Sequence, residues 1–292
     1  ITTQQTKISI PGINAFGGIS TAISDDGNTI AVGGYRDSSI APTLGAVWIY
    51  TRNINTWTLQ QKLVGSGYTG ASAIFQGNSC AISADGNTVA FGGYGDNSNQ
   101  GAVWVFTRNN NTWTQQGTKL TVTGNTGAPQ IGFQNSLSMS ADGNTIAVGG
   151  LTDNSNLGAT WIFTRTNGVW SQQGNKLIGA NYTGASVQQG QSTSLSSDGN
   201  ILAVGGVQDY TGLGAVWMFT RDSNGIWTQQ RNKLIGSNNT GTQNIFNGYT
   251  VSLSADGNTL AEAGFGDNSN AGAVWIFTRI NGVWSQQGPK LV

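Results

Sequence analysis

An eight-residue run of β-branched and aromatic residues occurs five times along the chain. It reads GAVWVFTR from Gly101, and close variants begin at Gly45, Gly158, Gly214 and Gly272. The run contains no proline and has glycine only at its first position, a composition typical of a β-strand. Five copies of one strand at regular spacing indicate a repeat architecture.

The spacing of other residues gives the length of the repeat. Lys62, Lys119, Lys176, Lys233 and Lys290 follow one another at intervals of 57 residues. We therefore expect a single domain over residues 1–292, because a repeat array counts as one unit whatever its length. The approximate repeats are 7–62, 63–119, 120–176, 177–233 and 234–292, and residues 1–12 form a closure segment.

Each repeat predicts four strands. In the second repeat, a strand over 79–83 alternates small and apolar residues, and an Asp-Gly pair turns the chain into an apolar strand over 88–93. A loop rich in asparagine and serine leads to the third strand, which begins at Gly101, and a fourth strand begins at Trp113. A long connector then crosses to the next repeat.

Five repeats of four antiparallel strands, without helical periodicity, predict an all-β fold, a five-bladed β-propeller. The alternative is an open solenoid, which needs atypical capping repeats at its ends, and the last repeat here is among the most regular. The string QQTKI near the N-terminus matches QQGPKL near the C-terminus. We therefore expect a ring that is closed where the N- and C-termini meet.

The five complete repeats already supply one fourth strand for each of the five blades. The N-terminal copy of this string therefore matches one fourth strand more than the blades need. It either adds an extra edge strand at the seam of the ring, or only Lys7 to Gly12 is used, as the connector into the first blade. Both alternatives remain open at this point.

Three strings recur with little change: SADGNTIAVGG, GDNSNQGAVWVFTR, and WTQQG followed by Lys-Leu. Together they resemble the FG-GAP-type repeats of β-propeller proteins, the group that includes integrin-like propellers, and the resemblance covers all five repeats. It implies a propeller with adhesion or ligand-recognition roles and no catalysis. Calcium-binding members of the family carry several carboxylates in one turn, whereas the matching turn here keeps one aspartate, namely Asp26, Asp85, Asp142, Asp198 or Asp256.

Charge and cysteine content narrow the range of partners. The 13 basic and 13 acidic side chains balance, so no excess charge attracts nucleic acid or an anionic membrane surface. No apolar run approaches the ~20 residues of a membrane-spanning helix, and we expect a soluble protein. The single cysteine, Cys80, excludes an intrachain disulfide, and a start at Ile1 suggests a processed product or an excised segment.

The ten tryptophans occupy two positions of the repeat. Those of the third strand lie between apolar neighbours and are expected to pack between blades: Trp48, Trp104, Trp161, Trp217 and Trp275. Those of the fourth strand lie beside a turn, and either pack or stack on the faces of sugar rings: Trp57, Trp113, Trp170, Trp227 and Trp284.

Polar residues of the connectors are further candidates for ligand contacts, because propellers present their connectors on a rim. These candidates are Tyr68, Asn181, Tyr182 and Asn239.

The DNSN loops are candidates for a weak calcium site, since carboxylate, amide and hydroxyl oxygens suit this cation. Their aspartates are Asp96, Asp153 and Asp267. The alternative is that these side chains only cap a structural turn. We expect no other cofactor.

Catalytic groups are scarce. The chain has no histidine and one glutamate, Glu262, which stands where the other repeats have Val or Phe. We expect Glu262 to reach solvent in a central channel; the alternative is a functional carboxyl group with a raised pKa. Cys80 occupies a strand position that predicts a small core residue, not a nucleophile. A catalytic triad or a histidine-metal centre cannot be assembled, and we expect no enzyme.

These observations favour a non-catalytic recognition or adhesion module that binds a glycan or protein through its rim loops, in the manner of a lectin. The alternative is a structural protein of a surface layer, virion or fibre that associates with itself. Either function suggests an extracellular or particle surface. No nucleic-acid partner and no membrane insertion are expected.

Overall fold

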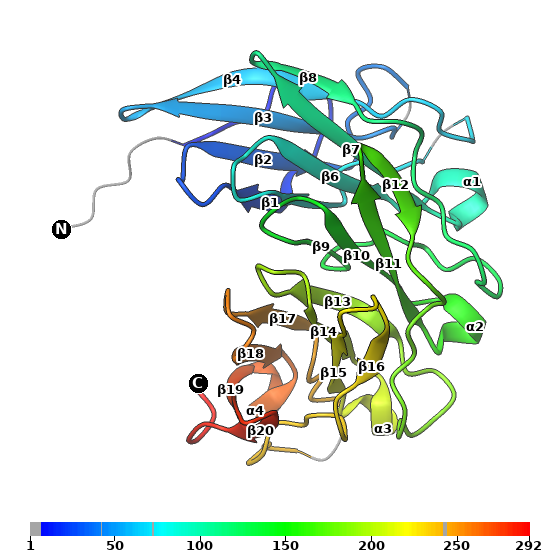
Figure 1. The fold of residues 1–292 in the computed structure, drawn as a ribbon, viewed down its shortest axis with the longest axis vertical. Coiled ribbons are helices and arrows are strands. Elements are labelled where there is room, and N and C mark those ends of the chain that lie inside the picture. The colour runs from blue at the N-terminus through cyan, green and yellow to red at the C-terminus, as the bar shows by residue number, and fades with distance from the viewer. Residues whose placement is uncertain (1–6, 42, 72, 242–243) are drawn as a thin grey trace.

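Five four-stranded antiparallel sheets make up the structure, a computed structural model that describes residues 7–41, 43–71, 73–241 and 244–292 (Figure 1). Within each sheet the strands pair in the order in which they occur along the chain. The prediction of an all-β chain with one four-stranded sheet per repeat is confirmed. This arrangement is consistent with a five-bladed propeller.

The strand bounds follow the repeat closely. The first sheet contains β1 (Gly17–Ile23), β2 (Thr29–Gly34), β3 (Ala46–Asn53) and β4 (Thr56–Leu63). The second contains β5 (Ser79–Ile82), β6 (Thr88–Gly93), β7 (Ala102–Asn109) and β8 (Thr112–Gln115). The third contains β9 (Leu137–Met139), β10 (Thr145–Gly150), β11 (Ala159–Thr166) and β12 (Val169–Gln172). The fourth contains β13 (Gln189–Leu195), β14 (Ile201–Gly206), β15 (Ala215–Arg221) and β16 (Trp227–Gln229). The fifth contains β17 (Thr250–Leu253), β18 (Thr259–Gly264), β19 (Ala273–Ile280) and β20 (Val283–Gln286).

Four single helical turns stand where the sequence predicts loops. They are α1 (Asp96–Asn99), α2 (Asp153–Asn156), α3 (Asp209–Gly212) and α4 (Asp267–Asn270). Their second and third residues have left-handed backbone angles, as in Asn154 with φ of 49° and Ser155 with φ of 57°. Asparagine tolerates this region better than most residues, which suits the DNSN sequence. In the described residues no helix is long and apolar enough to cross a membrane.

Strand register gives every sheet one aromatic face and one aliphatic face. In the third sheet Val148 pairs with Trp161, and Ile146 pairs with Phe163, so their side chains share a face. Ala147 pairs with Ile162 and both point to the opposite side. Alternation along the strands therefore builds two different surfaces from one repeated sequence.

The aromatic face of each sheet packs on the aliphatic face of the sheet before it. Ala147 and Ile162 of the third sheet, for example, belong to one buried cluster with Trp217 and Phe219 of the fourth. All five tryptophans of the third strands have no exposed surface. Their predicted role in packing between blades is confirmed for the four that lie between two sheets.

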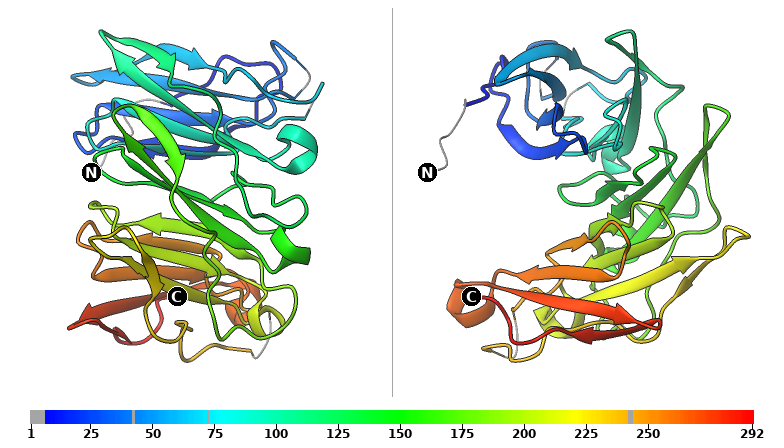
Figure 2. Two further views of the ribbon diagram at one scale, coloured as in Figure 1. Left: turned by 45° about the vertical axis from the view of Figure 1, so that its right-hand side comes forward. Right: turned by 60° about the vertical axis from the view of Figure 1, so that its left-hand side comes forward.

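The five sheets form an arc and not a closed ring. The first sheet, in blue, and the fifth, in orange and red, lie at its two ends with an opening between them (Figure 2). Ile23 of the first sheet is 57% exposed. In the fifth sheet Val274 and Ile276 are only half-buried, whereas the matching Val103 and Val105 of the second sheet are fully buried. The prediction of a ring closed near the termini is therefore wrong, because the end faces stay uncovered.

Residues 7–12 lie against the aromatic face of the first sheet without forming a strand. Ile8 and Ile10 pack beside Trp48 and Tyr50, and the Tyr50 hydroxyl donates to the Ser9 carbonyl over 3.0 Å. These residues thus follow the connector alternative. The glutamines of the N-terminal string precede residue 7 and lie outside the described residues.

A buried ion pair ties each helical turn to the end of its own repeat. Asp153 of α2 is fully buried and lies 2.5 Å from Lys176 Nζ, and its other carboxylate oxygen accepts from the Thr126 backbone N–H over 2.6 Å. This ion pair explains why a lysine recurs at the same position of every repeat. The other pairs are Lys62 with Asp37, Lys119 with Asp96, Lys233 with Asp209, and Lys290 with Asp267.

We predict that Lys176→Met lowers the free energy of unfolding by about 3 kcal/mol, because it leaves Asp153 buried without its cation. The double variant Asp153→Asn/Lys176→Met should lose less than Lys176→Met alone. Urea unfolding measures both, and Arg231→Met, at an exposed arginine, is the matched control with a change within about 0.5 kcal/mol. An equal loss in Lys176→Met and Arg231→Met would contradict the role of the pair.

Candidate functional site

A hollow of about 330 Å³ lies where the innermost strands converge. Ser20 and Thr21 of β1, Cys80 of β5 and Thr250 of β17 line it, so strands from both ends of the arc contribute. Gln134 and Asn135, which lie just before β9 in the chain, add two residues with side-chain amides to the lining. None of the residues that line the hollow is charged. Its chemistry therefore suits an uncharged ligand with many hydrogen-bonding groups.

Backbone hydrogen bonds between the inner turns hold these strands around the hollow. The Ala84 N–H donates to the Ala141 carbonyl, and the Ala141 N–H donates to the Ser197 carbonyl, each over 2.9 Å. The same bond joins Asp25 to Ala84 and Ser197 to Ala255. Small residues at these turns permit the close approach, so the inner ends of all five sheets are fixed relative to one another.

The aspartates of the inner turns serve the turn itself. Hydrogen bonds from the Ser254 hydroxyl and from the backbone and side chain of Asn258 lower the pKa of Asp256 to about 2. The Ser254 Oγ lies 2.5 Å from the carboxylate. The same bonds recur at the other inner turns. A carboxylate held this way stays ionised and is a poor general base near neutral pH.

A row of aromatic rings runs across the first three sheets beside the hollow. Phe16 is 6.1 Å from Tyr35, Tyr35 is 5.9 Å from Phe75, Phe75 is 4.7 Å from Tyr94, and Tyr94 is 5.0 Å from Phe133, measured between ring centroids. The residues at the two ends of the row, Phe16 and Phe133, stand within two positions in the chain of Gly18 and Gln134, which line the hollow. The row therefore ends close to the hollow, although its own rings do not line it.

The exposed guanidinium of Arg36 lies over this aromatic row. Its Cζ is 5.1 Å from the Phe16 ring centroid and 5.4 Å from that of Tyr35. Both distances are within the range of cation–π attraction. The hollow, the aromatic row and this cation together form the candidate site.

Sequence reasoning missed the aromatic row. Its members stand just after the Gly-Gly of a second strand, as Tyr35 and Tyr94 do, or shortly before a first strand, as Phe75 and Phe133 do. The third and fourth sheets have Leu151 and Val207 after their Gly-Gly pairs. This difference between repeats was a visible signal, but only the fold brings the two positions together.

Four of the fourth-strand tryptophans, for which the sequence allows either packing or sugar stacking, donate their indole N–H to a glutamine of the preceding repeat. Trp170 donates its indole N–H to Gln116 Oε1 over 2.9 Å, and the Arg165 guanidinium lies 5.3 Å from its ring centroid. An arginine lies over each of the other four in the same way: Trp57, Trp113, Trp227 and Trp284. None of the five lines the hollow. Sugar binding by these rings stays a prediction. The arginine already covers one face of each ring, so a sugar could stack only on the other face.

The predicted rim residues lie apart from the hollow. Tyr68 and Tyr182 are 37% and 40% exposed. Asn181 donates from its side-chain amide to the Asn232 side chain over 3.2 Å, and Asn239 donates to the Gly236 carbonyl over 2.7 Å. None of these four residues lines the hollow, and their role in binding stays a prediction.

The aspartates predicted for calcium are committed to the protein. Asp96 and Asp267 are fully buried, and each binds a lysine with one carboxylate oxygen and a backbone N–H with the other, as Asp153 does. In the described part of the chain no three His, Cys, Asp or Glu side chains gather as a metal site would require. A calcium ion would have to displace the lysine, and its binding stays an untested prediction.

Glu262 does not reach solvent in the channel, and that expectation is wrong. The side chain is 1% exposed, beside Trp275, and its Oε2 accepts from the Gly248 backbone N–H over 2.8 Å. Burial raises the pKa of Glu262 to about 8, and the backbone hydrogen bond opposes this only in part. The carboxyl group is therefore mostly protonated at neutral pH.

Cys80 was expected to be a small core residue. It packs against the buried core of the first two sheets but is only partly buried, and it also lines the hollow. Burial raises the pKa of its thiol to about 11. The thiol therefore stays protonated near neutral pH, and the expectation that Cys80 is not a nucleophile is consistent with this pKa.

Comparison with protein-family models and with curated proteins finds no match. Comparison with solved structures finds similar folds at low sequence identity. A protein of unknown function from Desulfotomaculum acetoxidans has a TM-score of 0.59 and 14% identity, over 92% of this chain and 68% of that one. The periplasmic gluconolactonase PpgL from Pseudomonas aeruginosa has a TM-score of 0.55 and 18% identity, over 92% and 69%. Hydrazine synthase from Kuenenia stuttgartiensis has a TM-score of 0.54 and 14% identity, over 98% and 69%.

These likenesses support a propeller-like fold, and they correct two expectations. The neighbours are multi-blade propellers that include a gluconolactonase, so the closer resemblance to FG-GAP repeats is not supported. The expectation of a non-catalytic recognition or adhesion module is contradicted, because a gluconolactonase is among the proteins with a similar fold. The adhesion, lectin-like and virion roles find no support among them.

We predict that the stability of the protein falls between about pH 4.5 and pH 8, where the unfolded chain releases the Glu262 proton and the folded chain keeps it. Glu262→Gln removes this contribution. As the pH rises, the parent should therefore lose unfolding free energy relative to the variant, and this relative loss should level off above about pH 8. Its total is at most about 5 kcal/mol, at 1.36 kcal/mol per pKa unit. Urea unfolding at a series of pH values measures it, and a pH-independent difference would contradict the buried, protonated carboxyl.

Proposed function

We propose that the chain is an enzyme-type propeller that binds a small sugar lactone at the central hollow and catalyses its hydrolysis. The observation that carries the proposal is the uncharged, hydrogen-bonding lining of the hollow beside a row of aromatic rings. Hydroxyl and amide groups match the hydroxyls of a sugar ring, and aromatic faces match its C–H face. The gluconolactonase among the fold neighbours supports the choice of substrate class.

Hydrolysis of a lactone needs water to attack the ring carbonyl and charge to be stabilised on its oxygen. The Gln134 and Asn135 side-chain amides lie at the hollow and can donate to that oxyanion. The ring C–O bond then breaks, and one molecule of water has been added to give a hydroxy acid. The product is an anion at neutral pH, and the guanidinium of Arg36 near the aromatic row favours its carboxylate.

The proposal needs no resident cofactor and no macromolecular partner. Balanced charge over the chain supports a small-molecule ligand over nucleic acid. The periplasmic location of the gluconolactonase neighbour supports a working place outside the cytoplasm.

We predict that the protein accelerates hydrolysis of glucono-δ-lactone above the spontaneous rate, measured by acid release at constant pH. Asn135→Leu should lower kcat/KM by about 100-fold, because it removes an oxyanion donor without adding charge. Asn232→Leu, at an exposed asparagine away from the hollow, is the matched control and should keep the parent rate. A circular dichroism spectrum equal to that of the parent ensures that each variant is folded.

Two results would overturn the proposal. One is the absence of both acceleration and binding, the latter measured by NMR titration with lactone and with gluconate. The other is an equal loss of rate in the two asparagine variants, which would move the site away from the hollow.

A further inference from the structure

Polar bonds recur at the interior interfaces between sheets, and the indole bond is present at every one of them. Between the second and third sheets, the Trp161 indole N–H donates to the Thr123 carbonyl over 2.9 Å, and the Ser79 hydroxyl donates to the Gly132 carbonyl over 2.9 Å. Near the outer edge, Trp170 donates to Gln116. The indole bond recurs at all four interior interfaces, to the carbonyls of Ser66, Thr123, Ala180 and Ser237.

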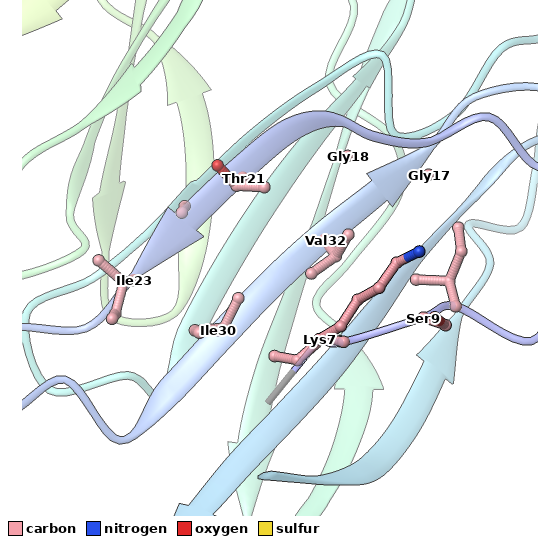
Figure 3. A pocket seen from close by; sticks show the side chains of 11 residues that line it. Lys7, Ser9, Gly17, Gly18, Thr21, Ile23, Ile30 and Val32 are labelled. Carbon is pink, nitrogen blue, oxygen red and sulfur yellow. The ribbon is translucent and has the colours of Figure 1, made fainter. Parts of the chain in front are cut away.

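The first sheet carries the aromatic half of this interface with no sheet against it. Trp48 is fully buried by the residues around it, yet its indole N–H has no hydrogen-bond partner in the described part of the chain. Ile23 is 57% exposed, whereas its counterpart Leu195 in the fourth sheet is 8% exposed. A hollow of about 590 Å³ opens against this face, lined by Ile23, Ile30 and Val32 among others (Figure 3).

The fifth sheet carries the complementary aliphatic half. Ala261, Val274 and Ile276 are half-buried, although their counterparts in the second sheet have at most 1% of their surface exposed. Gln287 is exposed at the position where Gln116 accepts the indole N–H of the following sheet. A second apolar hollow, of about 360 Å³, lies along this face beside Val274.

We propose that these two end faces are docking surfaces for further blades that carry this same repeat, inserted in the opening of the arc. An inserted blade would present an aliphatic face to Trp48 and an aromatic face to Val274 and Ile276, as consecutive blades already do. Two fold neighbours have length to spare for such blades, because 92% of this chain matches only 68% and 69% of theirs. The inference does not depend on the proposed enzymatic function.

A second intact copy of this chain fits the opening poorly. Every interior interface turns the next sheet around the same centre (Figure 2). A copy whose fifth sheet docked on the first sheet would therefore carry its remaining four sheets around that centre and onto the fifth sheet already there. Blades without such an arc behind them avoid this collision.

The test extends the full chain with its own repeats. A copy of residues 120–233, which contains the third and fourth repeats, is fused after Val292. We expect amide hydrogen exchange in β1, β18 and β19 to slow by about tenfold or more, because the end faces become interior interfaces. The matched control carries Trp161→Ser and Trp217→Ser in the added copy only. It should leave the exchange of β1, β18 and β19 as it is in the unextended chain.

The parent strands report docking even where the added segment is unstable on its own. Unchanged exchange in β1, β18 and β19, with the added repeats folded or unfolded, would overturn the proposal. Sedimentation of the unextended chain provides a second arm: a stable dimer with the same strands protected would also overturn it, since a second copy would then occupy the end faces.

Discussion

The indole of the third-strand tryptophan is the contact on which the structure depends. At four interfaces it fills the space between two sheets and donates its N–H to a connector carbonyl. Glycine is required where the connector passes over the indole ring, because a Cβ at Gly65 or Gly179 would lie 2.1 Å from an indole carbon. One residue type thus fixes the distance between sheets, the path of the connector and the close approach of the chain.

The candidate site follows from this packing. Neighbouring sheets are joined by the indole bond, near their outer edge by the Trp–Gln bond, and at their inner turns by backbone hydrogen bonds, while the Asp–Lys pair holds each repeat together. The inner strands consequently converge without contributing charge, and their small polar residues line the hollow. Regular packing builds the framework, and residues that differ between repeats, such as Gln134 and Phe133, give one part of it chemical character.

The sequence predicted the repeating framework well, because every strand, turn and buried tryptophan recurs in register. It failed where a property belongs to the assembly of repeats. The matching end strings suggested a closed ring, but closure depends on the angle between sheets, which no repeat encodes visibly. The rim residues such as Tyr182 stay candidates, and the aromatic row could not be predicted beside them, because its members Tyr35 and Phe75 are 40 residues apart in the chain. Glu262 was expected in solvent, since burial of one exceptional residue cannot be derived from the pattern of the others.

The most direct test of this account compares two substitutions that remove the same atoms. Trp161→Phe removes the indole N–H that donates to the Thr123 carbonyl, whereas Trp48→Phe removes an indole N–H that has no partner among the described residues. Urea unfolding should show that Trp161→Phe costs about 1–3 kcal/mol more than Trp48→Phe. Equal losses in the two variants would contradict the claim that the indole hydrogen bond, and with it the repeated interface, holds the sheets together.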